Sequence, residues 1–155
     1  MATTLFDAKP YDPSKDRRRR NLVIGVVIAV VLIAGLLWWF RYWPYERKVD
    51  QFFTALQTSD YEKAYGIWMN DPNWKQHPEK YARYPFREFY LDWGPSGEWG
   101  VIKSHKVDTA VAPRGSSTGV IVVTTVNERA EQACVWVEKR DKTLSFPPVK
   151  AVTCR

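Results

Sequence analysis

The chain has 155 residues and carries 23 Lys and Arg against 17 Asp and Glu, a net charge of +6. Residues 1–21 hold six basic and three acidic residues, a net +3, which leaves +3 for residues 41–155. Because no concentrated basic patch results, the composition argues against a nucleic-acid partner. The sequence contains no P-loop, G-x-G-x-x-G or H-E-x-x-H motif, so it lacks the markers of common nucleotide-binding and zinc-protease sites.

Residues 22–40 form an uninterrupted apolar segment, LVIGVVIAVVLIAGLLWWF. As a helix rising ~1.5 Å per residue it covers roughly 28 Å, close to the ~30 Å hydrocarbon core of a bilayer. The segment is longer than the apolar part of a secretory signal and no A-x-A pattern directly follows it, so we expect an uncleaved transmembrane signal anchor over residues 21–43. A buried core helix would need a larger globular remainder. Gly25 and Ala29 have small-xxx-small spacing, which leaves helix self-association open.

The flanks of this segment differ in charge. Arg17, Arg18, Arg19 and Arg20 directly precede it, and basic residues tend to stay on the cytoplasmic side of a span. We therefore expect residues 1–20 to be a basic cytoplasmic arm, the anchor to lie in the cytoplasmic (inner) membrane, and the rest to be extracytoplasmic. Aromatic residues suit the far membrane interface, where a ring buries its body and hydrates its polar edge. This interface belt comprises Trp38, Trp39, Tyr42, Trp43 and Tyr45.

The extracytoplasmic part is expected to begin with helices. An apolar stripe with the spacing i, i+3, i+4 and i+7 predicts an amphipathic helix over residues 46–58. Ser59 and Glu62 fit an S-x-x-E capping box that opens a second helix over residues 61–69. Shorter helical stretches follow over residues 79–93 and end at a Gly- and Pro-rich turn. The stripe of the first helix consists of Val49, Phe52, Phe53 and Leu56.

From residue 98 onward the pattern changes to β-structure. Residues 101–111 indicate one long strand, residues 120–126 (VIVVTTV) a central strand, and residues 132–138 the next. Residues 143–146 are expected to pair back onto the sheet. Two prolines then break the ladder, and residues 149–153 are expected to add a short edge strand.

Cys134 and Cys154 are the only cysteines, and both fall on the expected extracytoplasmic side. An oxidising compartment permits a disulfide between them, worth about 3 kcal/mol in the chain-entropy model. Two buried free thiols are the alternative. The two cysteines, with His77 and His105 far away in sequence, do not have zinc-ligand spacing, so no metal and no cofactor is expected.

Consecutive helices followed by consecutive strands predict an α+β fold with about three helices packed on a curved antiparallel sheet. Residues 49–65, VDQFFTALQTSDYEKAY, resemble the opening helix pair of the NTF2-like (cystatin-like α+β cone) superfamily, whose members often begin with the pattern F-F-x-A-L-x-x-x-D-Y-x-x-A-Y. The resemblance extends over residues 46–155, with its specific part in the first twenty residues. It implies a strongly bent sheet and likeness to small membrane-anchored bacterial versions of this fold.

The resemblance also implies an apolar pocket between helices and sheet. Some relatives are enzymes, such as ketosteroid isomerases, with an aspartate base and a tyrosine-containing oxyanion hole. No residue here falls in a motif that transfers such a role, so no catalytic residue is assigned. Trp74 and Trp99 lie off the helical stripes and are the candidates for a surface contact, whereas the other aromatic residues are interpreted as core. Candidates for chemistry by residue type alone are Asp92, Asp108, Tyr81, Tyr84 and Tyr90.

The function expected from the sequence is a single-pass, membrane-anchored extracytoplasmic binding or scaffold domain without catalysis. Its partners would be the lipid bilayer and a protein, a membrane complex or a small apolar ligand. The alternative is an anchored NTF2-like enzyme that acts on a small apolar substrate in the cone pocket. A third possibility is that the apolar helix itself is the functional element, packed as an accessory subunit of a membrane assembly.

Overall fold

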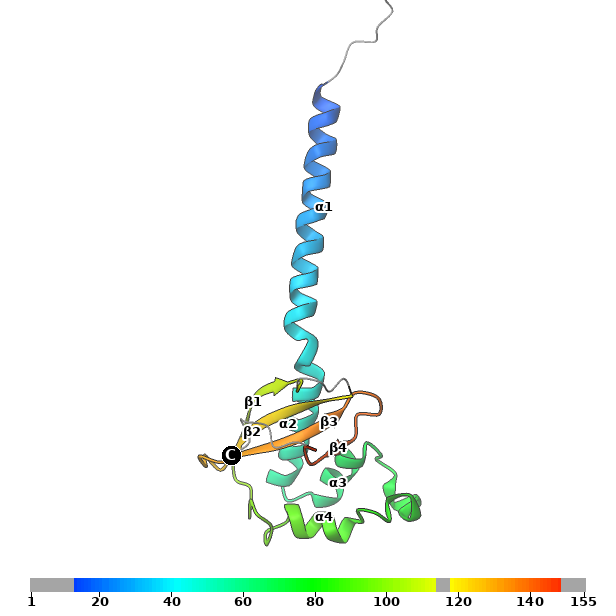
Figure 1. Cartoon of the computed structure of the whole chain (residues 1–155), viewed down its shortest axis with the longest axis vertical. Helices are drawn as coiled ribbons and strands as arrows, with labels where there is room; N and C mark the ends of the chain where they lie inside the picture. The colour runs from blue at the N-terminus through cyan, green and yellow to red at the C-terminus, as the bar shows by residue number, and fades with distance from the viewer. Residues whose placement is uncertain (1–12, 114–117, 149–155) are drawn as a thin grey trace, which may run out of the picture. The chain divides into compact units, whose positions relative to one another are not determined.

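The computed structural model describes residues 13–113 and 118–148. These residues form an α+β chain with one long N-terminal helix, shorter helices and a four-stranded antiparallel sheet (Figure 1). Contacts divide the chain into two compact units, Met1–Arg41 and Tyr42–Arg155. The α+β class expected from the sequence is confirmed, whereas the strand expected over residues 149–153 lies outside the described residues.

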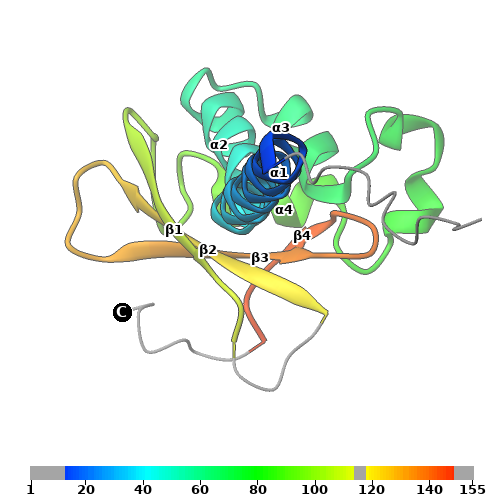
Figure 2. The ribbon, with the colours of Figure 1, turned by 90° about the horizontal axis from the view of Figure 1, so that it is seen from above.

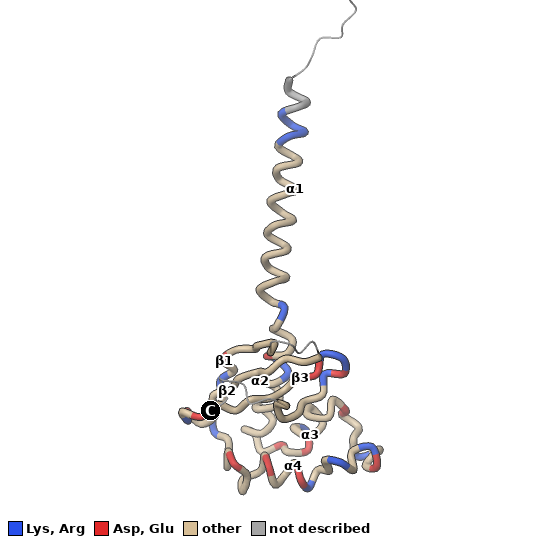
Figure 3. Tube along the Cα trace, in the orientation of Figure 1, with Lys and Arg blue, Asp and Glu red and all other residues tan. Residues whose placement is uncertain are grey.

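The first unit contains helix α1 (Pro13–Trp39), and the 3-10 helix η1 (Phe40–Tyr42) follows it. No proline occurs between residues 13 and 44, so the backbone hydrogen-bond ladder can continue. Lys and Arg flank the apolar stretch and none lies within it (Figure 3). Its large apolar side chains are 49–81% exposed. Among the described helices, this is the one long and apolar enough to cross a membrane, a property that fits either an anchor or a signal sequence.

The second unit opens with helices α2 (Trp43–Gln57) and α3 (Tyr61–Met69), where the sequence predicts a helix pair. Pro44 occupies the first turn of α2, a position where a helix does not need the missing N–H. The apolar stripe of α2 faces the core, because each of its four residues is at most 2% exposed. The amphipathic pattern therefore located the buried face of α2 correctly.

The start of α3 differs from the expectation. Asp60 is the N-cap, and its Oδ1 accepts a hydrogen bond from the Lys63 backbone N–H at 3.1 Å. Ser59 has φ 58° and belongs to the turn between the helices. The predicted capping box based on Ser59 is therefore wrong by one residue, because two neighbouring residues both have capping side chains.

Three short helices follow: η2 (Trp74–Gln76), η3 (Pro78–Tyr81) and α4 (Phe86–Trp93). The last two overlap the helical stretch expected over residues 79–93, and η3 begins one residue earlier, at Pro78. Gly94 ends α4 in close contact with the preceding turn. A Cβ at this position would lie 2.3 Å from the Tyr90 carbonyl oxygen, so a side chain does not fit without a shift.

The sheet is an antiparallel meander with the order β1-β2-β3-β4. A register shift between Val107 and Thr109 places Asp108 at a bulge in the first strand. Such a bulge increases the local twist of a strand. The strands are β1 (His105–Val111), β2 (Gly119–Val126), β3 (Gln132–Glu138) and β4 (Leu144–Ser145).

The first strand is shorter than the sequence predicts, because residues 101–104 do not join the sheet. The side chain of Asn127 holds this segment instead. Its Oδ1 accepts from the Lys103 N–H at 2.7 Å, and its Nδ2 donates to the Val101 carbonyl at 3.0 Å. An amide 24 residues away along the chain thus satisfies backbone groups that a strand would pair.

Helices α2, α3 and α4 cover one face of the sheet (Figure 2). Alternate residues of β2 face this layer, where Val120, Val122 and Val126 join the main core. The intervening residues Ile121 and Val123 form a second cluster with Trp136 on the other face. The centre of the main core is aromatic. The ring of Phe52 lies 5.1–6.1 Å, between centroids, from those of Phe53, Trp68, Phe89 and Trp93.

Candidate functional site

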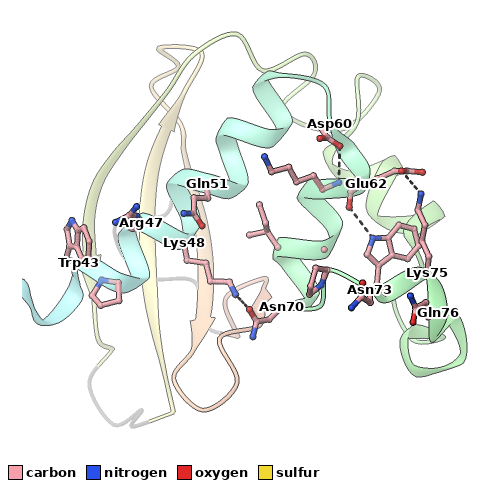
Figure 4. A pocket seen from close by; sticks show the side chains of 16 residues that line it. Trp43, Arg47, Lys48, Gln51, Asp60, Glu62, Asn70, Asn73, Lys75 and Gln76 are labelled. Carbon is pink, nitrogen blue, oxygen red and sulfur yellow. Dashed lines mark hydrogen bonds and ion pairs between the residues drawn. The ribbon is translucent and has the colours of Figure 1, made fainter.

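A large groove opens on the surface of the second unit, and we call it the α2–α3 groove (Figure 4). Side chains of α2 form one wall, and those of α3, η2 and the turn between them form the rest. Its volume is about 880 Å³, which lies within the range of small-ligand sites. The residues that line it include Trp43, Arg47, Lys48, Lys63, Ile67 and Lys75.

The charges that line the groove are predominantly positive. Four cations, Arg47, Lys48, Lys63 and Lys75, stand against two carboxylates, Asp60 and Glu62. Lys75 forms an ion pair with Glu62 at 2.5 Å, and the Asp60 carboxylate caps α3. Within the described ranges, Arg47 and Lys63 form no ion pair, so the groove keeps two uncompensated cations, one from each helix.

Lys48 connects three segments at one end of the groove. Its Nζ donates to Asn70 Oδ1, and Asn70 Nδ2 donates to the Asp141 carbonyl at 2.7 Å. Burial lowers the pKa of Lys48 to about 8; nearby Asp141 opposes this shift and Lys142 adds to it. An anion next to such a buried cation raises its pKa again, because the anion stabilises the charged form.

An apolar surface accompanies these cations. Trp43 is 49% exposed, and the Arg47 guanidinium lies over its ring at 5.0 Å from the centroid. Ile67 is half-buried and packs against the main core. The groove therefore offers both cationic groups and apolar surface. The sequence reasoning placed no site here, since the only signal was Lys and Arg on the polar faces of two helices, which is also typical of a solvated surface.

The two tryptophans predicted for a surface contact lie in different surroundings. Trp74 is half-buried in η2; it stacks on Phe86 at 5.2 Å between centroids, and its Nε1 donates to the Glu62 carbonyl at 3.2 Å. Its remaining surface lines the α2–α3 groove. Trp99 is only 8% exposed and belongs to the main core. Little of its ring is left for a surface contact.

The residues predicted to contact the membrane fall in two groups. Arg17, Arg18, Arg19 and Arg20 are exposed on α1, and Trp38 and Trp39 are 69% and 81% exposed. Trp43 also keeps half of its surface. Tyr42 and Tyr45, in contrast, are partly buried against the core of the second unit, and Lys142 Nζ lies 4.1 Å from the centre of the Tyr45 ring. These two tyrosines pack on the domain, which limits their share in an interface belt.

The acidic and tyrosine residues considered for chemistry do not meet in one cavity. Tyr84 donates to Asp92 Oδ2 at 2.7 Å, and Asp92 is exposed. Burial, with this hydrogen bond and the Asp92 charge, raises the pKa of Tyr84 far above its ordinary value. Asp108 is exposed on the sheet, where it accepts hydrogen bonds from the side chains of Thr125 and Gln132.

Tyr81 and Tyr90 lie apart from these pairs. Tyr81 donates to Asp71 Oδ2 at 2.6 Å, and this bond, with the Asn73 backbone N–H, lowers the pKa of the Asp71 carboxyl. Tyr90 is 40% exposed and packs edge-on against Tyr61.

The space between helices and sheet, where an NTF2-like pocket is expected, is filled by aromatic rings. The rings of Phe52, Phe53, Phe89 and Trp93 there are only 0–3% exposed.

Of the two histidines, His105 makes side-chain contacts that join a strand to a helix. Its ring stacks on Phe53, its Nδ1 faces Gln57 Oε1 at 3.0 Å and its Nε2 faces Asp50 Oδ1 at 3.1 Å. These contacts tie β1 to α2. His105 is therefore a structural residue between helix and sheet. Among the described residues, no group of three or more His, Cys, Asp or Glu side chains could hold a metal ion.

Two further sequence features bear on chemistry. Residues 115–119, GSSTG, match the letters of the G-x-S-x-G nucleophile motif, a match that sequence reasoning missed. That motif needs a strand-to-helix turn, whereas this segment joins strand β1 to strand β2, and Ser117 lies outside the described residues. Cys134 lies on β3, but Cys154 is likewise outside the described residues, so the disulfide between them stays a prediction.

Comparison with protein-family models, with curated proteins and with solved structures finds no match to this chain.

Proposed function

We propose that the protein is a single-pass membrane protein, with residues 1–20 in the cytoplasm and a non-catalytic NTF2-like binding domain, residues 46–155, displayed outside. One observation carries the proposal. The apolar side chains of α1 are about half exposed or more, and none of its most apolar stretch is buried. An apolar surface of this length is unfavourable in water and favourable in lipid. The second unit has its own hydrophobic core, which supports its folding without α1.

Two features favour an anchor over a cleaved signal. The apolar segment is long enough for the hydrocarbon core, and no A-x-A site directly follows it. Arg17 to Arg20 precede it, as basic residues precede both anchors and cleaved signals. The arginines support the orientation, because they tend to stay in the cytoplasm. The same orientation puts both cysteines in an oxidising compartment, as a disulfide requires.

The NTF2-like assignment is supported by the arrangement of the second unit. An opening helix pair with the F-F-x-A-L-x-x-x-D-Y-x-x-A-Y pattern is followed by α4 and then by a twisted antiparallel sheet with helices on one face. The bulge at Asp108 provides the local twist that a curved sheet needs.

A binding role is supported by the contrast between interior and surface. Aromatic rings fill the space between helices and sheet, whereas the α2–α3 groove is open and carries uncompensated cations. The enzyme alternative needs an acidic or histidine side chain in a closed cavity, and the candidate residues that the structure describes are instead paired on the surface or used in structural contacts.

Fractionation and intact mass together test the anchor. Cells that express the full chain are lysed and the membranes are washed at alkaline pH. Mass spectrometry then measures the intact mass of the protein in the pellet. We expect an 18.1 kDa species that resists the wash. A shortened chain in the soluble fraction would refute the anchor and leave a processed signal sequence.

A further inference from the structure

We propose that the α2–α3 groove binds the phosphate headgroup of an anionic phospholipid in the leaflet beside the anchor. The inference rests on the proposed membrane anchoring and adds a ligand to the proposed binding role. Its basis is the meeting of uncompensated cations and exposed apolar surface in one groove that begins directly after the apolar segment.

Chain connectivity alone keeps the groove close to the bilayer. Trp43 follows Phe40, the last residue of the apolar segment, by three positions, at most ~11 Å of chain. Arg47 lies four residues further along α2, a rise of ~6 Å. However the domain turns on its anchor, Arg47 stays within about 17 Å of the end of the apolar segment. Phospholipid headgroups are thus the most concentrated anions near this end of the groove.

The charges of the groove fit a phosphate. Glu62 is paired with Lys75, and Asp60 caps α3 and forms no ion pair with Arg47 or Lys63, so the four cations and two carboxylates that line the groove leave a net charge of +2. A guanidinium donates two parallel hydrogen bonds to phosphate oxygens, and an ammonium adds a compact positive charge. Lys48, beside them on α2, is held by Asn70, and a bound anion would stabilise its charged form.

The apolar part of the groove distinguishes a lipid from a free ion. Half of the Trp43 ring is exposed under the Arg47 guanidinium, and Ile67 contributes further apolar surface. These groups suit the glycerol and upper acyl region of a lipid, which inorganic phosphate lacks. An acidic peptide would satisfy the cations as well, but it has to reach the groove from solution, whereas lipids are present at high effective concentration beside the anchor.

The test uses the full chain in nanodiscs of phosphatidylcholine with or without phosphatidylglycerol. Native mass spectrometry measures how strongly phosphatidylglycerol is retained. Each basic residue near an anionic surface contributes about fivefold in affinity, so the double variant Arg47→Gln/Lys63→Gln should lose roughly 30-fold. The matched control Arg83→Gln/Arg87→Gln removes the same charge from exposed positions outside the groove and should retain the lipid as the unchanged chain does.

Lysine acylation provides a second readout on the unchanged protein. Phosphatidylglycerol should protect Lys63 from an amine-reactive reagent and leave Lys106, whose side chain is 82% exposed on β1, fully reactive. Near-ultraviolet circular dichroism of both double variants shows that they are folded. Equal loss of lipid in the groove and control variants would overturn the inference, because it would indicate a diffuse charge effect.

The other outcomes identify other ligands. Equal protection of Lys63 by inorganic phosphate in phosphatidylcholine discs would mean a free-ion site, and stronger protection by an acidic peptide would mean a protein-binding groove; either overturns the lipid assignment. Failure of the chain to insert into nanodiscs refutes the anchor and this inference together. Normal insertion without selective retention of phosphatidylglycerol refutes this inference alone.

Discussion

Removal of the Lys48 charge should stabilise the domain at neutral pH. Burial is the main reason that the pKa of Lys48 falls from 10.5 to about 8. The unfolded chain keeps this proton up to about pH 10.5, so between pH 8 and 10.5 unfolding takes up a proton. The free energy of unfolding therefore rises with pH in this window, and below pH 8 the folded state carries the full cost of the charge.

The size of the effect follows from the shift. The fall in the pKa from 10.5 to about 8 corresponds to roughly 3 kcal/mol. Because the side chain is only half-buried, solvent screening reduces this to about 1–2 kcal/mol. Lys48→Met keeps the apolar stem and gives up the hydrogen bond to Asn70, whose exposed amide can bond to water. We expect a net gain of about 1 kcal/mol at pH 7, or roughly 3–6 °C in Tm for a domain of this size.

The assay is thermal unfolding of the full chain in detergent micelles, followed by near-ultraviolet circular dichroism from pH 7 to 10. Above pH 10 another group intervenes, because burial raises the pKa of Tyr65 to about 12 and its contribution to stability is lost as pH rises toward that value. The unchanged protein and the exposed control Lys106→Met should gain stability between pH 8 and 10, and Lys48→Met should not. An unaltered rise in Lys48→Met, or a lower Tm at pH 7, would refute the reasoning.

Three further predictions concern the fold, each measured by chemical or thermal unfolding. Phe52→Ala should lower the free energy of unfolding by about 3–5 kcal/mol, because it leaves a cavity at the centre of a fully buried aromatic cluster. A loss under 1 kcal/mol would contradict this packing. Gly119→Ala should cost about 1–3 kcal/mol, since its Cβ would lie 2.1 Å from the Trp136 ring, and a Trp136→Leu background should remove most of the cost. Asp60→Ala should cost about 1 kcal/mol and Ser59→Ala much less; the reverse order would restore the Ser59 cap.

The regular elements could be predicted because their signals are local. The spacing of the apolar residues predicts the buried stripe of α2, and the run of β-branched residues predicts strand β2. Both are buried as expected. The end of the first strand could not be predicted in this way. Residues 101–104 have strand-forming residues, but a hydrogen-bonding side chain from Asn127 determines their conformation.

The candidate site could not be predicted from the sequence. Arg47 and Lys63 come from different helices, and only the packing of α2 on α3 brings them to one groove. The low pKa of Lys48 comes from its burial and, to a smaller extent, from the charge of Lys142, which is far from it in sequence. Trp99 lies outside the helical stripes and was therefore expected at the surface, but it is buried. A tryptophan outside a helical stripe still packs inward when the chain folds over it.

The central claim is that α1 remains in the membrane with the domain outside the cytoplasm. Alkaline phosphatase and green fluorescent protein, fused separately to the C-terminus of the full chain, test it directly, because the first is active only outside the cytoplasm and the second fluoresces only when it folds inside. We expect phosphatase activity and no fluorescence. Fluorescence without phosphatase activity would place the domain in the cytoplasm and contradict the account.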